Sequence, residues 1–159
     1  MNALRMLNHG TAKVCEVIMT IFSIVMVIAC FAQVVTRAIG TPLSWSEELA
    51  RYLAVWLTFI GAAYALHKRG LATVEIMFNA LKGIPQKILF LFISAVVLAF
   101  CVVMIVFGFD FALGFMNQTS PAMQIPKGAV YLSIPISGIL MILYQAELMG
   151  EYFFGKEDK

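Results

Sequence analysis

Four stretches of the sequence are apolar and contain no charged residue, and they limit what the chain can fold into. They are Val17–Thr36, Tyr52–Leu66, Ile88–Phe109 and Gly128–Ala146. An α-helix rises 1.5 Å per residue, so about 20 apolar residues cross the ~30 Å hydrocarbon core of a bilayer. Because a backbone in lipid must satisfy its hydrogen bonds internally, each stretch predicts a transmembrane helix.

These stretches predict an all-α integral membrane protein. We expect four transmembrane helices, over about residues 14–36, 46–67, 86–112 and 127–149. The connections between them are short, and 62% of the residues are apolar, compared with roughly 45–50% in ordinary soluble domains. The sequence therefore predicts a single membrane domain over residues 1–159.

The connection between the second and third spans has a pattern of its own, over residues 72–83. Its apolar residues fall at i, i+3, i+4 and i+7, namely Val74, Met77, Phe78 and Leu81. Glu75 lies on the opposite, polar side. A helix of this length cannot cross the membrane, so we predict a short amphipathic helix that lies in the membrane interface or against a partner.

Local signals shape the second and fourth spans. Ser44-Trp45-Ser46-Glu47 is typical of a capping box, in which Ser44 and Glu47 satisfy the first backbone amides of a helix. Pro135 lacks an amide hydrogen and predicts a kink in the fourth span. Tyr144 and Tyr152, near the end of that span, are expected to anchor it at the membrane interface.

Several classes of function find no support in the sequence. A net charge of +2 with scattered basic residues argues against nucleic-acid binding. The three cysteines form no C-x-x-C pair, and the two histidines lie beside charged residues rather than at haem-binding depth. No pattern of a hydrolytic nucleophile or metalloprotease occurs. We therefore expect no catalytic residue, no metal ligand and no cofactor.

The basic residues predict an orientation in the membrane. Lys and Arg gather at both termini and in the connection between the second and third spans, whereas the other two connections contain chiefly Arg37, Arg51 and Lys127. Basic residues are enriched on the cytoplasmic side of membrane proteins. Both termini are therefore expected in the cytoplasm.

The second span offers contact surfaces. Arg51 follows Glu47 at i, i+4 and Glu48 at i, i+3, so the group either neutralises itself or meets a partner's charge or a lipid headgroup. Small residues follow at helical spacing: Ala54, Thr58, Gly61 or Ala62, and Ala65. They let another helix approach closely, within the chain or from a partner. Candidate residues for contact with a partner or with lipid are Trp45, Glu47, Glu48, Arg51, Trp56, Gly61, Glu75 and Phe78.

Two blocks of residues resemble a known family. The first is Ser44-Trp45-Ser46-Glu47-Glu48-Leu49-Ala50-Arg51-Tyr52-Leu53, followed by Trp56 and Gly61-Ala62-Ala63. The second is Gln118-Thr119-Ser120-Pro121-Ala122 with Ile125-Pro126, Tyr131 and Ile134-Pro135-Ile136. Together they bracket most of the chain, and they resemble the small membrane subunit, of DctQ type, of tripartite ATP-independent periplasmic (TRAP) transporters.

The resemblance implies a supporting role in a secondary transporter. In such systems a periplasmic binding protein captures an organic acid, such as a C4-dicarboxylate or a sialic acid, and a large membrane subunit moves it with sodium by an elevator motion. The small subunit is expected to brace the large subunit in the bacterial inner membrane, with no transport site of its own. The implied partners are the large subunit, the binding protein through the complex, and membrane lipids.

The sequence departs from the family at one place, and one alternative remains. The family often has a His followed four residues later by an Asp, where this chain has Leu71 and Glu75, so no role of that His carries over. The alternative is an autonomous small multidrug-type transporter working as a dimer. It would need a carboxylate in mid-membrane, whereas Glu16 and Asp110 lie near the ends of their spans.

Overall fold

The computed structural model describes residues 2–68 and 84–154, and these parts are mainly helical. The helices are α1 (Asn2–Ala38), α2 (Ser44–His67), α4 (Ile84–Gly114), α5 (Lys127–Tyr131) and α6 (Ser133–Phe154). The prediction of an all-α fold with four long apolar helices is confirmed. The amphipathic helix predicted over residues 72–83, with Glu75 and Phe78, lies outside the described residues, as does Leu71.

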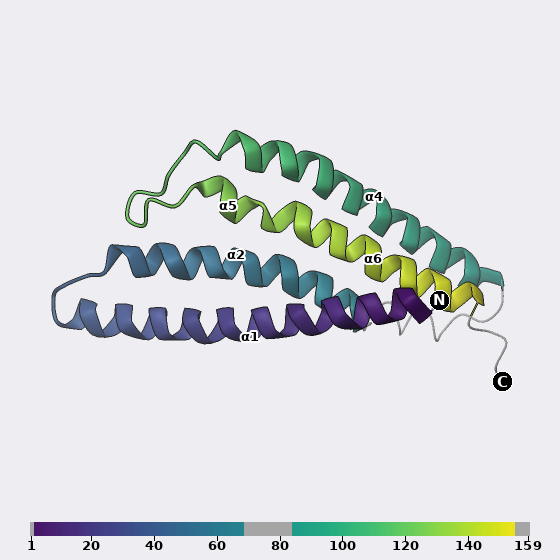
Figure 1. The fold of residues 1–159 in the computed structure, drawn as a ribbon, viewed down its shortest axis with the longest axis horizontal. Coiled ribbons are helices and arrows are strands. Elements are labelled where there is room, and N and C mark those ends of the chain that lie inside the picture. The colour runs from purple at the N-terminus through teal and green to yellow at the C-terminus, as the bar shows by residue number, and fades with distance from the viewer. Residues whose placement is uncertain (1, 69–83, 155–159) are drawn as a thin grey trace.

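The helices form a row rather than a closed square bundle (Figure 1). α1 and α2 make one antiparallel hairpin, and α4 makes a second hairpin with α5 and α6. The hairpins meet where α2 packs on α6, so the order across the row is α1, α2, α6, α4. Within the described residues α4 contacts neither α1 nor α2. Much of each helix therefore remains accessible to lipid or to another protein.

Four segments are long and apolar enough to cross a membrane. They are Met6–Ala38, Ser44–His67, Ile84–Gly114 and Lys127–Tyr152. The last joins α5 to α6 across Leu132, which is the only residue between them. All four helical segments extend beyond the charge-free stretches of the sequence, because charged residues near the ends are accommodated within the helices.

The interruption between α5 and α6 lies where Pro135 acts. Proline cannot donate to the carbonyl four residues earlier, here that of Tyr131, at which α5 ends. Pro135 is fully buried against α4. A Cβ atom added to Gly108 would lie 3.0 Å from Pro135 Cδ, so the absence of a side chain at Gly108 allows α4 to pass close to the interrupted helix.

The start of α2 differs from the predicted capping box. The N-cap residue is Leu43, which makes no side-chain capping hydrogen bond. The hydroxyl of Ser46 donates to the carbonyl of Leu43 at 2.8 Å, and the Glu47 carboxylate turns toward α1. The capping-box prediction was wrong because the Glu47 carboxylate bonds to Gln33 and Arg37 of α1 and not to the backbone of its own helix.

Tyr144 is not an anchor at a lipid interface. Its side chain is 0% exposed, and its hydroxyl lies 3.4 Å from that of Thr11 in α1. α1 begins at Asn2, well before the predicted start at residue 14, and its early turns cover this part of α6. The sequence places Tyr144 correctly near the end of the span, but not the helix that packs over it.

Candidate functional site

Glu47 joins α2 to the last turns of α1. Its Oε1 atom accepts a hydrogen bond from Gln33 Nε2 at 2.9 Å and pairs with Arg37 Nη2 at 3.1 Å. The pair with Arg37 is exposed, so it contributes little by itself. Its structural consequence is that Glu47 is directed toward α1 and not toward Arg51.

Glu48 joins α2 to the connection between α4 and α5. Its carboxylate oxygens accept hydrogen bonds from the backbone amides of Ala122 at 3.1 Å and Met123 at 2.9 Å. The connection is itself a tight hairpin, in which the amide of Lys127 donates to the carbonyl of Gln118 at 2.8 Å. Glu48 therefore brings together the two sequence blocks that resemble the family, although they are far apart along the chain.

Neither Glu47 nor Glu48 forms an ion pair with Arg51. Arg51 is exposed, and within the described residues it makes no hydrogen bond and no ion pair. The charge of Arg51 still acts on the Glu48 carboxylate through space. The predicted internal neutralisation of the Glu47, Glu48 and Arg51 group is therefore incomplete, because both carboxylates are engaged elsewhere.

A strip of small side chains continues from Arg51 along the outer face of α2. Ala54, Thr58 and Ala62 are all exposed, and the Thr58 hydroxyl is satisfied within the helix by the carbonyl of Ala54 at 2.8 Å. The buried residues Leu53 and Ile60 lie on the opposite side of the helix. We call the surface of Arg51, Ala54, Thr58 and Ala62 the outer α2 face.

The outer α2 face differs from the exposed faces of α1 and α4. Those helices present large apolar side chains, for example Ile28 (62% exposed) and Phe31 (70%) on α1, and Phe92 (66%) and Phe107 (67%) on α4. Among the described residues of α2, the only large apolar side chain exposed in this way is Trp45. Large apolar side chains suit contact with lipid tails, whereas small ones suit close packing of helices.

The remaining candidates on α2 lie toward α1 or at the helix start. Trp56 is half-buried and meets Phe22 of α1 edge-on, with ring centroids 6.5 Å apart. A Cβ atom at Gly61 would lie 3.8 Å from the sulfur of Met19, so Gly61 also faces α1. Trp45 is 45% exposed. Ala62, not Gly61, is thus the small residue on the outer α2 face.

A polar cluster that the sequence analysis did not identify lies near the start of α1, at the opposite end of the helices from Glu47 and Glu48. Asn8 is completely buried, and its Nδ2 donates to Glu147 Oε2 at 2.6 Å and to the carbonyl of Leu143 at 3.0 Å. The same carboxylate oxygen lies 3.9 Å from His67 Nδ1. Glu147 thereby connects α1, α2 and α6 at one point. In the sequence, each of these three helices contributes one polar residue to the cluster, and no pattern indicates that the three residues meet.

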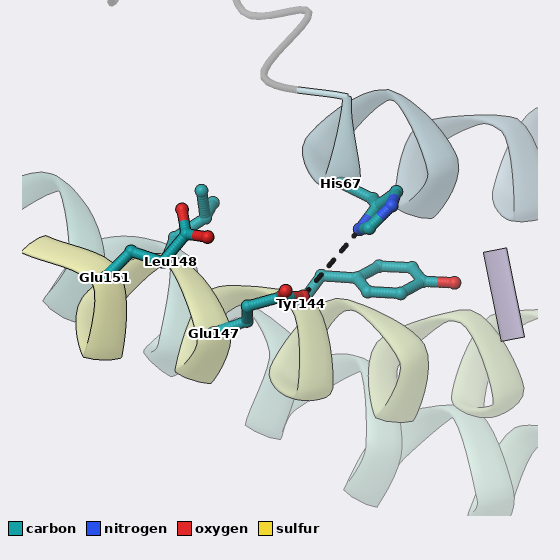
Figure 2. Close-up of a pocket in the computed structure, with 5 residues that line it drawn as sticks. All are labelled: His67, Tyr144, Glu147, Leu148 and Glu151. Carbon is teal, nitrogen blue, oxygen red and sulfur yellow. Dashed lines mark ion pairs between the residues drawn. The ribbon is translucent and has the colours of Figure 1, made fainter. Parts of the chain in front are cut away.

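A small hollow lies beside this cluster, under the end of α2 (Figure 2). Its volume is about 140 Å³, and it is lined by His67, Tyr144, Glu147, Leu148 and Glu151. The His67 ring lies over that of Tyr144, with centroids 4.8 Å apart. No group of three or more metal-binding side chains occurs among the residues that the structure describes. The contacts of Glu147 with Asn8 and His67 make the cluster a junction of three helices.

Comparison of the sequence with known families gives one match over most of the chain. The sequence model of the DctQ component of tripartite ATP-independent periplasmic transporters matches residues 26–153. This range includes the outer α2 face, Glu48 and the hairpin that Glu48 holds. It also includes Glu147, but it begins after Asn8.

Individual relatives agree with the family match. The chain is 32% identical over 141 residues to a TRAP transporter small permease protein of Haemophilus influenzae. This alignment covers 87% of this chain and 86% of the relative. It is 29% identical over 104 residues to the C4-dicarboxylate TRAP transporter small permease protein DctQ of Rhodobacter capsulatus, covering 64% and 46%. It is 27% identical over 110 residues to the isethionate TRAP transporter permease protein DctMQ of Oleidesulfovibrio alaskensis, covering 67% and 17%.

Proposed function

The chain belongs to the DctQ family, the small permease component of TRAP transporters, and from this premise we propose that it braces the large membrane subunit without transporting substrate itself. It is a multi-pass membrane protein and a transporter component, not an enzyme. The proposal concerns how such a component acts. A transporter that works by an elevator motion needs one part held still while another slides, and an added helical layer enlarges the fixed part.

The observation that carries this proposal is the outer α2 face. It consists of Arg51 and small side chains, on a row whose outermost helices present large apolar residues. In lipid, helices associate by close packing and polar contacts rather than by hydrophobic burial. A helix of the large subunit seated on this face would find both.

The relative named DctMQ supports the proposed partner. It is an isethionate TRAP transporter permease, and this chain aligns with only 17% of its length. A small-subunit sequence that forms part of a much longer permease favours a lasting association between the two kinds of membrane region. The same association between separate chains is our proposal here.

The substrate and the orientation are further parts of the proposal. The names of two relatives refer to isethionate and C4-dicarboxylate, both organic anions, and we propose sodium-coupled uptake of an organic acid by the complex. A periplasmic binding protein would deliver it. We place the chain in the bacterial inner membrane with both termini in the cytoplasm, which would put Glu48 and the hairpin after α4 on the periplasmic side.

Co-purification tests the proposal. This chain, with the only affinity tag, is co-expressed with the large membrane subunit of the same transporter and purified in a mild detergent. A stoichiometric complex is expected. A chain that purifies alone as a dimer would instead support the autonomous small transporter.

A further inference from the structure

Arg51 holds a positive charge that the described part of the chain does not pair. The two carboxylates nearest to it along the helix are directed elsewhere, Glu47 to Gln33 and Arg37 and Glu48 to the amides of the hairpin after α4. Neither is free to turn toward Arg51 without losing those hydrogen bonds. The charge of Arg51 is therefore available to a group outside the chain.

The depth of Arg51 makes an unpaired charge costly. α2 has 24 residues and is thus about 36 Å long, slightly more than the ~30 Å hydrocarbon core. Arg51 lies about 10 Å along the helix from Ser44, near the boundary of that core or just within it. A charged side chain at this depth requires a counter-charge or contact with water.

The surroundings of Arg51 indicate where the counter-charge comes from. Ala54, Thr58 and Ala62 continue the same face and leave room for the backbone of another helix to come close. A lipid-covered face would resemble those of α1 and α4, with large apolar side chains. The planar guanidinium of arginine pairs with a carboxylate through two parallel hydrogen bonds, which fixes the register of two packed helices.

We propose that Arg51 forms an ion pair with an Asp or Glu side chain on a helix of the large membrane subunit, and that this helix packs along Ala54, Thr58 and Ala62. The inference rests on the proposed function and adds the chemistry of the partner's contact. The pair sets the position of the partner helix along α2, and the small residues set its distance.

The test measures the dissociation constant between this chain and the purified large subunit in lipid-depleted detergent. Arg51→Gln is expected to raise the dissociation constant about tenfold or more, because the partner carboxylate is left unpaired in a water-poor contact. Arg51→Lys keeps the charge but loses the two parallel hydrogen bonds of the guanidinium. Its dissociation constant is expected to lie between those of wild type and Arg51→Gln. Arg37→Gln is the matched control: it removes one arginine at the same end of the molecule, from an exposed pair with Glu47, and is expected to leave affinity near wild type.

Each outcome decides between the possibilities. If the isolated Arg51→Gln chain unfolds at the same temperature as wild type, its loss of affinity is not caused by a loss of folding. Equal affinities for wild type and Arg51→Gln would overturn the ion pair while leaving the proposed function intact. An effect of Arg51 that appears only after phospholipid is added back would assign the counter-charge to a lipid phosphate and overturn the carboxylate. If the wild-type chain does not bind the large subunit at all, the proposed function fails and the inference fails with it.

Discussion

The carboxylate of Glu48 accepts a hydrogen bond of 2.9 Å from the backbone nitrogen of Met123, a residue 75 positions later in the chain. This contact joins the start of α2 to the hairpin between α4 and α5. A carboxylate is well suited to hold two neighbouring amides, because each of its oxygens can accept one of them. The two helical hairpins are thus tied at the end where their own connections lie (Figure 1).

We predict that Glu48→Ala loosens the hairpin after α4. The amides of Ala122 and Met123 lose their acceptor, so both should exchange with deuterium faster than in wild type. Asp110→Asn is the control, because Asp110 is exposed near the end of α4 and, within the described part of the chain, makes no hydrogen bond to the hairpin. Unchanged exchange at Ala122 and Met123 in Glu48→Ala would contradict the assigned role of Glu48.

Asn8 and Glu147 should be energetically coupled. Asn8 is completely buried and its side-chain amide donates to Glu147 at 2.6 Å, so removing either group leaves the other poorly satisfied. A double-mutant cycle of Asn8→Ala and Glu147→Ala in detergent is expected to give a coupling of about 1–2 kcal/mol. Additive effects of the two substitutions on thermal stability would show that the contact contributes no net stability.

Gly128 should not tolerate a side chain. A Cβ atom there would overlap the carbonyl oxygen of Ala112 and lie 2.9 Å from Met116 Cα, both backbone atoms of a neighbouring segment. Gly128→Ala is therefore expected to destabilise the protein by about 1–3 kcal/mol. Gly150→Ala, with no atom within 4 Å of the added Cβ, should be neutral or stabilise α6 by up to about 1 kcal/mol. Equal thermal stability of the two variants would argue against the close contact of α4 and α5.

Bulk added to the outer α2 face should impair assembly but not folding. Ala62→Leu places a large side chain where we propose that a partner helix packs, and overpacking of this kind is expected to weaken affinity for the large subunit about tenfold. Ala99→Leu adds the same bulk to the exposed face of α4, which is expected to meet lipid. Equal affinities of the two variants for the large subunit would remove the outer α2 face from the interface.

The helices could be predicted from the sequence because the information is local. A stretch such as Ile88–Phe109, without a single charge, has few alternatives to a transmembrane helix. The length of α1 was underestimated because its first turns, with Asn8 and Thr11, are polar enough to read as a flank. The Asn8 side-chain nitrogen donates to Glu147 of α6, and the Thr11 hydroxyl accepts a hydrogen bond from Tyr144 of the same helix. That partner helix is not apparent from spacing along the chain.

The same limit applies to the charged residues of α2. Helical spacing suggested Arg51 as the partner of Glu47. In the structure Glu47 pairs instead with Arg37 on α1, and Glu48 accepts hydrogen bonds from two backbone amides after α4. Tertiary neighbours outcompeted an i, i+4 pair that contributes only about 0.2–0.5 kcal/mol on its own. The resemblance to the family identified the correct segment, while the roles within it depended on which helices meet.

The most direct test of the central claim is uptake by proteoliposomes that contain this chain alone, the large subunit alone, or both, with the binding protein and a sodium gradient supplied. The account predicts no uptake by this chain alone and full uptake only when both membrane chains are present. Uptake by liposomes that contain this chain as the sole membrane protein would contradict it.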